Sequence, residues 1–445
     1  MQGQSDSMNS QFHRSVLLFA SKLGYQTRSF DAAARRLGVR LAFVTDRCHE
    51  LSNPWGDDAF AVRFDAPEHA AGRALQEFRK RHFDGVIALG DRPTIAAAYT
   101  ARGLGISTNH PVAVEACHNK LRMREVFREA GLLTPWFHSI PLSPDPEPAL
   151  LGVRYPCVIK PLALSASQGV MRADHREDFL AAIGRLKNLF ERPELRSQRQ
   201  EDFTQALAEG YINGSEVAVE GILVEGELKL LAIFEKPDPL EGPFFEETIY
   251  VTPPGLSAPQ QEAIRRAAQG AVRAIGLSHG PVHAEFRIND QGIWPIEIAP
   301  RPIGGLCARS LEFASQDHPH LISLEELVLR HAIGEDISGW ERERLASGVM
   351  MIPVPTSGLL ESVNGLEDAR HVPCITEIEI TGRIRDNILA WPEGSSYLGF
   401  IFAKAETGAD VENALRSAHS RLRFEIRNTL PVEHPVTGKI IASPG

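Results

Sequence analysis

Two glutamates and an arginine stand close together near the middle of the chain. Residues 282–302 read VHAEFRINDQGIWPIEIAPRP, with Glu285 and Glu297 inside two apolar-alternating runs and Arg301 just after the second. The polar NDQG segment between the runs predicts a β-hairpin. If its loop has an odd number of residues or a bulge, the two carboxylates face each other with Cβ atoms roughly 5 Å apart, an unfavourable pairing unless a divalent cation lies between them.

The alternative for this segment is structural. An even, bulge-free loop would place Glu285 and Glu297 on opposite faces, as two ordinary exposed strand glutamates. The hairpin alone does not decide between the two arrangements.

Two lysines earlier in the chain are candidates for binding an anion. Lys160 ends the apolar run CVIK, and lysine is rarely buried without a partner. The small-residue loop ALSASQGV follows, so its backbone N–H groups and the hydroxyls of Ser165 and Ser167 are able to close over phosphate oxygens. Lys120 opens a predicted helix, where the helix dipole disfavours a cation, so anion binding is favoured there over helix stabilisation. The alternatives are a plain surface loop and two exposed lysines.

The N-terminal third alternates apolar runs with amphipathic ones. Predicted strands cover residues 15–20, 40–46 and 83–91, and predicted helices cover 29–39 and 92–105. This order favours a doubly wound parallel sheet. No GxGxxG follows the first strand, so a nicotinamide cofactor is not expected. Asp91 is predicted to be the N-cap of the helix after it, with a ligand contact as the alternative.

A chain of 445 residues is long enough for roughly three domains, and the pattern of predicted strands and helices changes twice along it. Hairpin-like strand pairs separated by helices fill the middle, including a helix from residue 117 closed by Gly131 and Pro135. The last third predicts a helix, three strands and a final helix over 409–426. The predicted fold class is α/β and α+β, with these parts: a polar tail 1–14, an α/β domain 15–115, a central domain 116–319 and a smaller α+β lobe 320–445.

Composition excludes several kinds of protein. The net charge of −10 disfavours nonspecific binding to nucleic acid or to an anionic membrane. No apolar run approaches the roughly 20 residues of a membrane span, and the N-terminus has no signal-peptide pattern, so a cytoplasmic protein is expected. Five scattered cysteines without a CxxC motif indicate neither disulfides nor structural zinc, and burial as small apolar residues is predicted.

Taken in order, these motifs resemble the ATP-grasp superfamily of carboxylate–amine ligases. The matching segments are HNK with Lys120, VIKP with Lys160, Gly169-Val170, AEGYINGSE with Glu209 and Glu216, HAEFR with Glu285, and EIAPRPIGG with Glu297 and Arg301. Over residues 15–426 the chain is most similar to the L-amino-acid (dipeptide) ligase branch. GYQTRSFDAAARRLGV and GDRPTIAAAYTARGLG are similar to its N-terminal lobe, and GSSYLGFIFAKAETGADVENAL is similar to its C-terminal lobe.

The resemblance implies an ATP site. Lys120 and Lys160 would hold the phosphates under a lid loop over residues 165–169, which includes Gly169. The resemblance also implies that this loop belongs to a lid subdomain at about 155–212. Glu209 would lie beside the adenine amino group. The backbone of Tyr211 and Ile212 would read the edge of the ring. Glu216 would bind the ribose, with Glu220 as the second choice because strand alternation allows it equally.

The same resemblance implies the reacting centre. Glu285 and Glu297 would bind Mg²⁺, with Mn²⁺ as the alternative ion, and Arg301 would meet the transferred phosphate and the developing oxyanion. Gly304 and Gly305 would let backbone N–H groups approach. Ala299 stands where asparagine is common, so one metal contact would come from elsewhere. The lid is also poorer in glycine than in many relatives.

The substrate side is less specific. Within FEETIYVTPPG, Glu247 is favoured over Glu246 for gripping a substrate ammonium, and a solvated acid pair is the alternative. His283 either lines the cleft or is structural. The predicted activity joins a small carboxylate, with an amino acid as one substrate, to an amine through an acyl phosphate. An ATP-grasp carboxylase of the biotin or purine type and a nucleotide-binding module without turnover are the alternatives. Small-molecule substrates are the expected partners, and a homodimer is compatible with the sequence.

Overall fold

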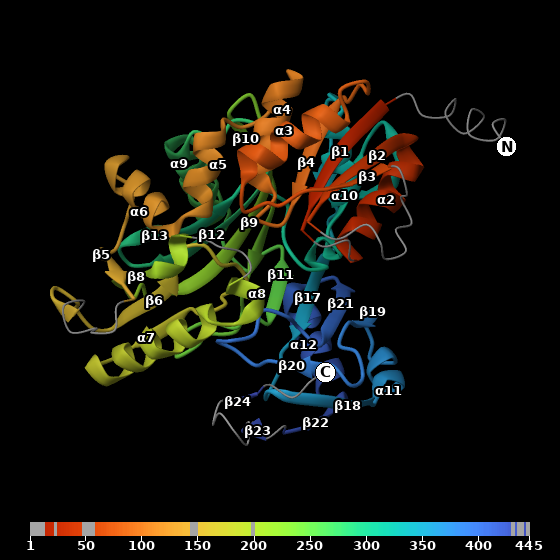
Figure 1. The fold of residues 1–445 in the computed structure, drawn as a ribbon. Coiled ribbons are helices and arrows are strands. Elements are labelled where there is room, and N and C mark those ends of the chain that lie inside the picture. Colours follow the sequence, from red (N-terminus) through yellow and green to blue (C-terminus); the bar gives the residue numbers. More distant parts are fainter. Residues whose placement is uncertain are drawn as a thin grey trace.

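A computed structural model describes residues 14–21, 25–46, 58–142, 150–196, 201–428, 432–433 and 440–441 (Figure 1). Most of the predicted polar tail and Cys48 lie outside these residues. Among the described cysteines, Cys117, Cys157 and Cys307 are buried as expected, whereas Cys374 is exposed. No helix in the described part of the chain is long and apolar enough to cross a membrane.

The N-terminal part is a four-stranded parallel sheet in the order β3-β2-β1-β4. Its strands are β1 (Arg14–Ala20), β2 (Val39–Thr45), β3 (Ala59–Ala61) and β4 (Gly85–Leu89), and its helices are α2 (Tyr25–Leu37), α3 (Pro67–Glu77) and α4 (Thr94–Leu104). Leu17 and Phe19 belong to one apolar cluster, whereas Val16 and Leu18 belong to another, so helices cover both faces of β1. This sheet is the predicted doubly wound element.

The helix after β4 does not begin as predicted. Pro93 occupies the N-cap position of α4 and makes no side-chain cap. Asp91 contributes only its backbone oxygen, which accepts a hydrogen bond from the Thr94 hydroxyl at 2.6 Å. The carboxylate of Asp91 binds Arg301 instead. The N-cap prediction was therefore wrong, because a cation 210 positions further along the chain competes for this side chain.

A second, smaller sheet has the order β5-β8-β6-β7. Its strands are β5 (Phe137–Pro141), β6 (Cys157–Pro161), β7 (Met171–Ala173) and β8 (Gln205–Gly210), and α7 (Arg176–Phe190), followed by α8 (Pro193–Arg196), packs against it. The single helix predicted from residue 117 is two helices, α5 (Pro111–His118) and α6 (Lys120–Glu129). They are separated by Asn119, whose side chain accepts a hydrogen bond from the Arg122 N–H and caps α6.

An eight-stranded antiparallel sheet runs through the middle of the molecule (Figure 1). Its order is β13-β12-β9-β10-β11-β17-β21-β19, with these bounds: β9 Ser215–Val224, β10 Glu227–Glu235, β11 Ile249–Thr252, β12 Gly280–Asn289, β13 Gly292–Ala299, β17 Ala346–Ile352, β19 Ile375–Ile380 and β21 Gly399–Ala405. Helix α9 (Ala258–Ile275) packs near β13, and α12 (Gly408–His419) packs against β21. The sheet crosses the predicted boundary at 319/320, and the domain bounds stay a prediction.

The remaining elements surround this sheet. They are β14 (Glu312–Ser315), β15 (His318–Ser323), α10 (Leu324–Ala332), β16 (Glu341–Arg342), β18 (Gly358–Asn364), α11 (Leu366–Arg370), β20 (Asn387–Ile388), β22 (Arg423–Arg427), β23 (Val432–Glu433), β24 (Ile440–Ile441) and the short helices η3 (Glu201–Thr204) and η4 (Cys307–Ser310). Helix α10 packs back onto α2, and Arg36 contacts Glu326 at 3.2 Å. The final helix predicted over 409–426 was too long, because it ends at His419 and β22 follows.

Candidate active site

A cavity of about 320 Å³ lies where the three parts of the chain meet. Residues on its wall come from the loop after β4, from β6 and the loop after it, from the large sheet and from the segment before β21. Fifteen of the sixteen predicted site residues line it: Lys120, Lys160, Ser165, Ser167, Glu209, Tyr211, Ile212, Glu216, Glu247, His283, Glu285, Glu297, Arg301, Gly304 and Gly305. The two second-choice acids, Glu220 and Glu246, and the remaining predicted residue, Gly169, are not among the lining residues.

The two glutamates of the hairpin lie directly opposite each other. Glu285 of β12 pairs with Glu297 of β13, and the register shifts by a bulge immediately after Glu285. The bulge is what brings both acids to one face. Ala299 pairs with His283 and has no oxygen in its side chain, so this position offers a metal no side-chain ligand. The Lys120 Nζ is 3.5 Å from the Glu297 carboxylate.

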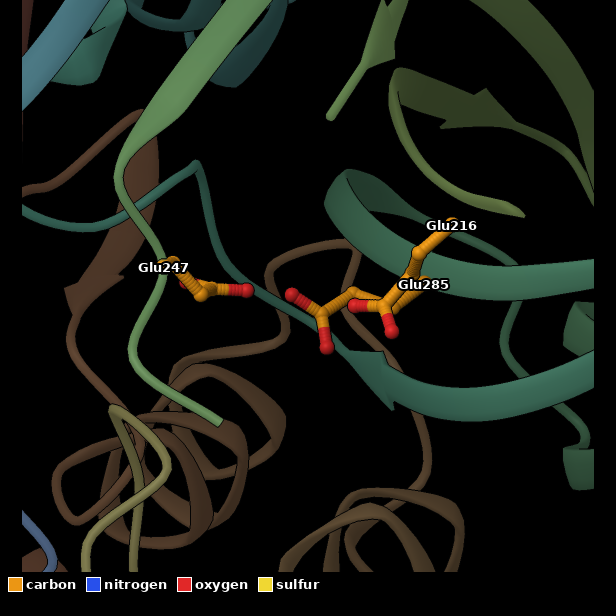
Figure 2. Close-up of side chains that lie close together, drawn as sticks. All are labelled: Glu216, Glu247 and Glu285. Atoms are coloured by element: carbon orange, nitrogen blue, oxygen red, sulfur yellow. The ribbon is translucent and has the colours of Figure 1, made fainter. Parts of the chain in front are cut away.

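A lysine that the sequence reading missed lies among three acids. The Lys236 ammonium contacts Glu216 at 2.7 Å, Glu285 at 2.9 Å and also Glu247. One oxygen from each acid lies within 4.8 Å of the others, and Figure 2 shows Glu247 pointing across the gap toward Glu285 and Glu216. Burial disfavours the charge of Lys236, but the surrounding carboxylates raise its pKa well above the usual value.

The same balance acts on the acids. Burial raises the pKa of Glu247 to about 7, although Lys236 opposes it. Burial also acts on Glu285, but Lys236 and His283 hold the pKa of that carboxyl well below its ordinary value. The neighbouring Glu246 is not part of this group, since it accepts a hydrogen bond from the Val354 N–H. The preferred member of the predicted acid pair is thus the one that faces the cavity.

The two acids considered for the ribose have different environments. Glu216 accepts from Arg287 at 3.0 Å, and the two residues pair in register across β9 and β12. Glu220 is 1% exposed, contacts the His283 ring and accepts from the backbone N–H of Ile303. Burial opposes protonation of His283, but Glu220 raises its pKa to about 9. Glu216 lines the cavity, whereas Glu220 does not, although both Glu216 oxygens already accept hydrogen bonds, one from Lys236 and one from Arg287.

Glu209 is held by two cations. Arg124 donates to both of its oxygens at 2.7 and 3.2 Å, and Lys160 contacts one of them at 2.5 Å. Burial by itself raises the pKa of Glu209, but the opposite effect of Arg124 and Lys160 is larger in total. The pKa of Glu209 is therefore lowered to about 2. Burial lowers the pKa of Lys160 to about 8 despite Glu209. Since both Glu209 oxygens already accept hydrogen bonds from cations, its side chain is a weaker candidate for contacting an adenine amino group than the nearby backbone.

Parts of that backbone are also engaged. The Tyr211 N–H donates to the Pro156 oxygen at 3.1 Å, and Arg287 donates to the Ile212 oxygen at 2.6 Å. The guanidinium groups of Arg172 and Arg287 lie 4.3 and 5.2 Å from the centroid of the Tyr211 ring. This arrangement gives the end of the cavity near Tyr211 an aromatic surface flanked by cations.

The loop after β6 reaches over the cavity and is attached to the C-terminal lobe. The Trp391 indole donates to the Ala166 oxygen at 3.0 Å, and the Gly169 N–H donates to the Pro392 oxygen at 2.8 Å. Gln168 adds a bond of 2.9 Å to the Glu393 oxygen. Below the loop, the Lys120 ammonium donates to the Leu164 oxygen at 2.7 Å.

Arg301 forms a two-pronged pair with Asp91, at 2.8 and 3.1 Å. Burial opposes both charges, yet Arg301 lowers the pKa of Asp91 to about 2 and Asp91 raises the pKa of Arg301. Gly304 and Gly305 follow at the cavity wall, and Gly305 has a φ of 62°, a conformation that favours glycine. The wall of the cavity thus carries carboxylates together with the ammonium and guanidinium groups that pair with them.

Two family models match the chain in the expected order. The ATP-grasp domain matches residues 153–310, and the L-amino acid ligase C-terminal domain 2 matches residues 350–427. The chain therefore carries an ATP-grasp domain over residues 153–310. A solved L-amino acid ligase from Bacillus licheniformis is 27% identical, with a TM-score of 0.77 over 94% of this chain and 99% of that one. The predicted fold class and family resemblance are confirmed by these matches.

Two other similar proteins differ in how much of the chain they match. The alanine–anticapsin ligase of Bacillus subtilis is 28% identical over 204 residues, 42% of this chain and 40% of that protein. The chain spans 40% to 64% of the length of the first three curated relatives that it matches. A biotin carboxylase domain from Hydrogenobacter thermophilus, solved as a dimer with MgADP and bicarbonate, is 16% identical with a TM-score of 0.62, over 93% of this chain and 92% of that one. That likeness concerns the fold alone.

Proposed function

We propose that this ATP-grasp protein is an ADP-forming ligase that joins the carboxylate of a small molecule to an amine, with an amino acid as one substrate. The observation that carries the proposal is the opposed pair Glu285 and Glu297 in one cavity with Lys120, Lys160 and Arg301. Such a cavity can neutralise a triphosphate and a carboxylate at the same time.

The donor set fits Mg²⁺. Glu285 and Glu297 supply hard oxygens on one face, which Mg²⁺ prefers, while water or phosphate oxygens would complete the shell at the position where Ala299 offers none. Bound there with ATP, the ion would offset the charge of the phosphate oxygens. Mn²⁺ would fit the same oxygens.

The chain's own residues would position the nucleotide. Lys120 and Lys160 are both at least nine-tenths buried and line the cavity under the loop over 165–169, so their ammonium groups would meet the phosphates. Glu216, which lines the cavity, would bind the ribose, and the segment around Tyr211 and Ile212 would face the ring. Ser165 and Ser167 on the loop would close over the phosphate oxygens.

The reaction would then have two steps. A carboxylate oxygen of the first substrate attacks the γ-phosphorus of ATP, the bond to the β-phosphate oxygen breaks, and ADP leaves. The amine then attacks the acyl carbon, the carbon–oxygen bond to phosphate breaks, and inorganic phosphate leaves while the amine loses a proton. Arg301 would stabilise the charge on the transferred phosphoryl group and on the oxyanion, with Gly304 and Gly305 nearby.

The substrate ammonium would be held by Glu247, and His283 lines the cavity beside Glu285. The ligase reading is favoured over a carboxylase because the match to L-amino acid ligase extends into the C-terminal domain over residues 350–427. It is favoured over a module without turnover because the cations and acids needed for phosphoryl transfer are all gathered in one cavity.

The test is ADP release with MgATP and pairs of amino acids, compared with bicarbonate plus biotin and with no added substrate. Mass spectrometry of the mixture identifies the amide product. We expect ADP and a dipeptide-sized product to appear in equal amounts with amino acids only. ADP release that needs bicarbonate, or no release with any substrate, would contradict the proposal.

A further inference from the structure

One side of the cavity is apolar. Five side chains form it: Tyr250, Ile303, Cys307 and Met351, which belong to one apolar cluster of the core, and Tyr397, which packs against that cluster. We call this set the apolar wall. None of its members carries a charge at neutral pH, and burial raises the pKa of the Cys307 thiol above its usual value, so that group stays neutral.

The apolar wall adjoins the acid cluster. Burial and then the charge of Glu247 raise the pKa of Tyr250 well above its ordinary value, and the same two causes act on Tyr397. Glu247 is therefore a charged neighbour shared by these two side chains. The Lys236 ammonium lies 5.0 Å from the centroid of the Tyr250 ring. A ligand cation at Glu247 would have the apolar wall beside it.

The apolar wall stands on regular structure. Tyr250 lies in β11, and Met351 lies in β17 opposite Phe400 of β21. The Tyr397 ring packs at 4.9 Å from Trp391 and 6.1 Å from Phe400. Residues fixed by strands and ring contacts discriminate substrate size better than a loop that adapts.

We propose that the apolar wall is the side-chain subsite for an α-amino acid with an uncharged aliphatic, thioether or aromatic side chain. Glu247 would hold the ammonium of this amino acid, and its carboxylate would be the one that ATP phosphorylates. The inference rests on the proposed function and adds the substrate class to it.

Charge and desolvation select this class. An acidic substrate side chain here would lie near the carboxylates of Glu247 and Glu285, which disfavours its binding. The nearby Lys236 would not offset this charge, because its ammonium already contacts both acids. Glycine would leave the apolar wall uncovered. A basic side chain is the strongest competitor, because it would be drawn to Glu247. In an apolar pocket, one methylene more or less changes selectivity by about tenfold or more.

The test is kcat/KM for ADP release with leucine, methionine, phenylalanine, glycine, aspartate or lysine, each paired with the same amine substrate. We expect the three apolar amino acids to exceed the other three by about tenfold or more. Met351→Ala removes part of the apolar wall, so it should raise the ratio of phenylalanine to leucine severalfold.

Met350 supplies the matched control. It neighbours Met351 on β17 and is equally buried, at 4% exposure, but it belongs to the C-terminal apolar cluster and does not line the cavity. Met350→Ala should leave the order of substrates unchanged. Amino-acid-dependent ADP release that favours lysine, aspartate or glycine, or an equal change in both variants, would overturn the subsite and leave the ligase function standing. Absence of release with every amino acid would overturn both.

Discussion

Lys236 holds together three acids that would otherwise repel one another. Its ammonium contacts Glu216, Glu247 and Glu285 and is 3% exposed at the side chain. Two of these acids have different proposed partners, the ribose for Glu216 and an ammonium for Glu247. The lysine therefore links the nucleotide side of the cavity to the substrate side.

Replacing this lysine should destabilise the protein in a way that a metal ion partly reverses. Lys236→Met leaves three buried carboxylates without their shared cation, and removing one partner of a buried pair costs about 3 to 5 kcal/mol of unfolding free energy. We expect a lower Tm and a larger rise in Tm with Mg²⁺ than the wild type shows. Thermal melts with and without Mg²⁺ measure both. An unchanged Tm, or equal Mg²⁺ effects, would contradict this account.

Variants of Arg301 and of its partner Asp91 distinguish a catalytic role of Arg301 from a structural one. If Arg301 stabilises charge that develops in the transition state, Arg301→Met should lower kcat about a hundredfold or more with little change in ATP affinity. Asp91→Asn weakens the same pair but keeps the cation, so its kcat should fall much less. Arg301→Lys should restore only part of the activity, because a point charge lacks the planar fork.

Steady-state kinetics and thermal melts on the same three variants provide the measurement. If Arg301→Met and Asp91→Asn lose the same share of kcat and are lowered equally in Tm, the role of Arg301 is structural.

The acids and lysines were predictable as residues, but their partners were not. Lys120, Lys160 and Glu285 occupy motifs in a fixed order, so their types and spacing indicated a site. Lys236 comes directly after the apolar strand β10, and Lys160 lies near the end of the apolar strand β6, so their similar positions were a usable sign. The pairing of Asp91 with Arg301 joins residues 210 positions apart, so no local sequence pattern indicates it.

At the scale of elements, one bulge decides the geometry of the pair Glu285 and Glu297. The shift after Glu285 in β12 brings it opposite Glu297. The sequence indicated the hairpin and its faces, but it left the register open because bulges depend on the neighbouring strands. In the same way, the final helix was predicted too long, since the pairing of β22 with β18 competes for residues 423–427.

The loop after β6 is a strained element held by the C-terminal lobe. Ala166 and Ser167 have φ of 54° and 52°, a conformation that costs roughly 1 to 2 kcal/mol for a residue with a Cβ. Hydrogen bonds to residues 391–393 compensate for part of that cost. The low glycine content of this loop was visible in the sequence, whereas its attachment to a distant segment could not be predicted.

Weakening this attachment should loosen the loop. Trp391→Phe keeps the ring beside Tyr397 but removes the indole donor to Ala166, a hydrogen bond that contributes about 0.5 to 1.5 kcal/mol. We expect faster amide exchange over residues 164–170 and a KM for ATP raised about 2- to 10-fold. Hydrogen exchange and kinetics measure the two effects.

Trp294→Phe is the matched control, because it removes an indole hydrogen bond to Asn289 in the hairpin, away from the loop. Equal changes in both variants, or none in Trp391→Phe, would show that the attachment does not restrain the loop.

For the whole molecule, the large sheet is the shared frame. It carries Glu285 and Glu297 at one end, Tyr250 and Met351 further along, and β21 beyond them. Helix α10 contacts both β12 of this sheet and β4 of the N-terminal sheet. The ring of His331 in α10 lies 4.5 Å from the ring of His279. Fold class followed from the sequence because strand and helix patterns are local, whereas the path of one sheet through two predicted domains depends on long-range pairing.

His331 should make stability depend on pH. It is 7% exposed, and burial followed by the charge of His279 lowers its pKa to about 4. The unfolded chain, with a pKa of about 6.5, binds more protons between these values, so this group lowers the free energy of unfolding as pH falls from about 6.5 to 4. His331→Phe should reduce the drop in Tm between pH 7.5 and 5.

The exposed His320 provides the comparison, and His320→Phe should leave that drop unchanged. If His331→Phe shows the same loss of Tm on acidification as the wild type, other groups control the pH dependence.

The central claim, a carboxylate activated by ATP before the amine attacks, is tested most directly by following oxygen. The amino acid that supports ADP release is labelled with ¹⁸O in its carboxylate, and the released inorganic phosphate is analysed by mass spectrometry. An acyl phosphate predicts one ¹⁸O atom in each phosphate, because the carboxylate oxygen that attacks phosphorus leaves with it. Phosphate that carries no label while ADP and amide accumulate would contradict the account.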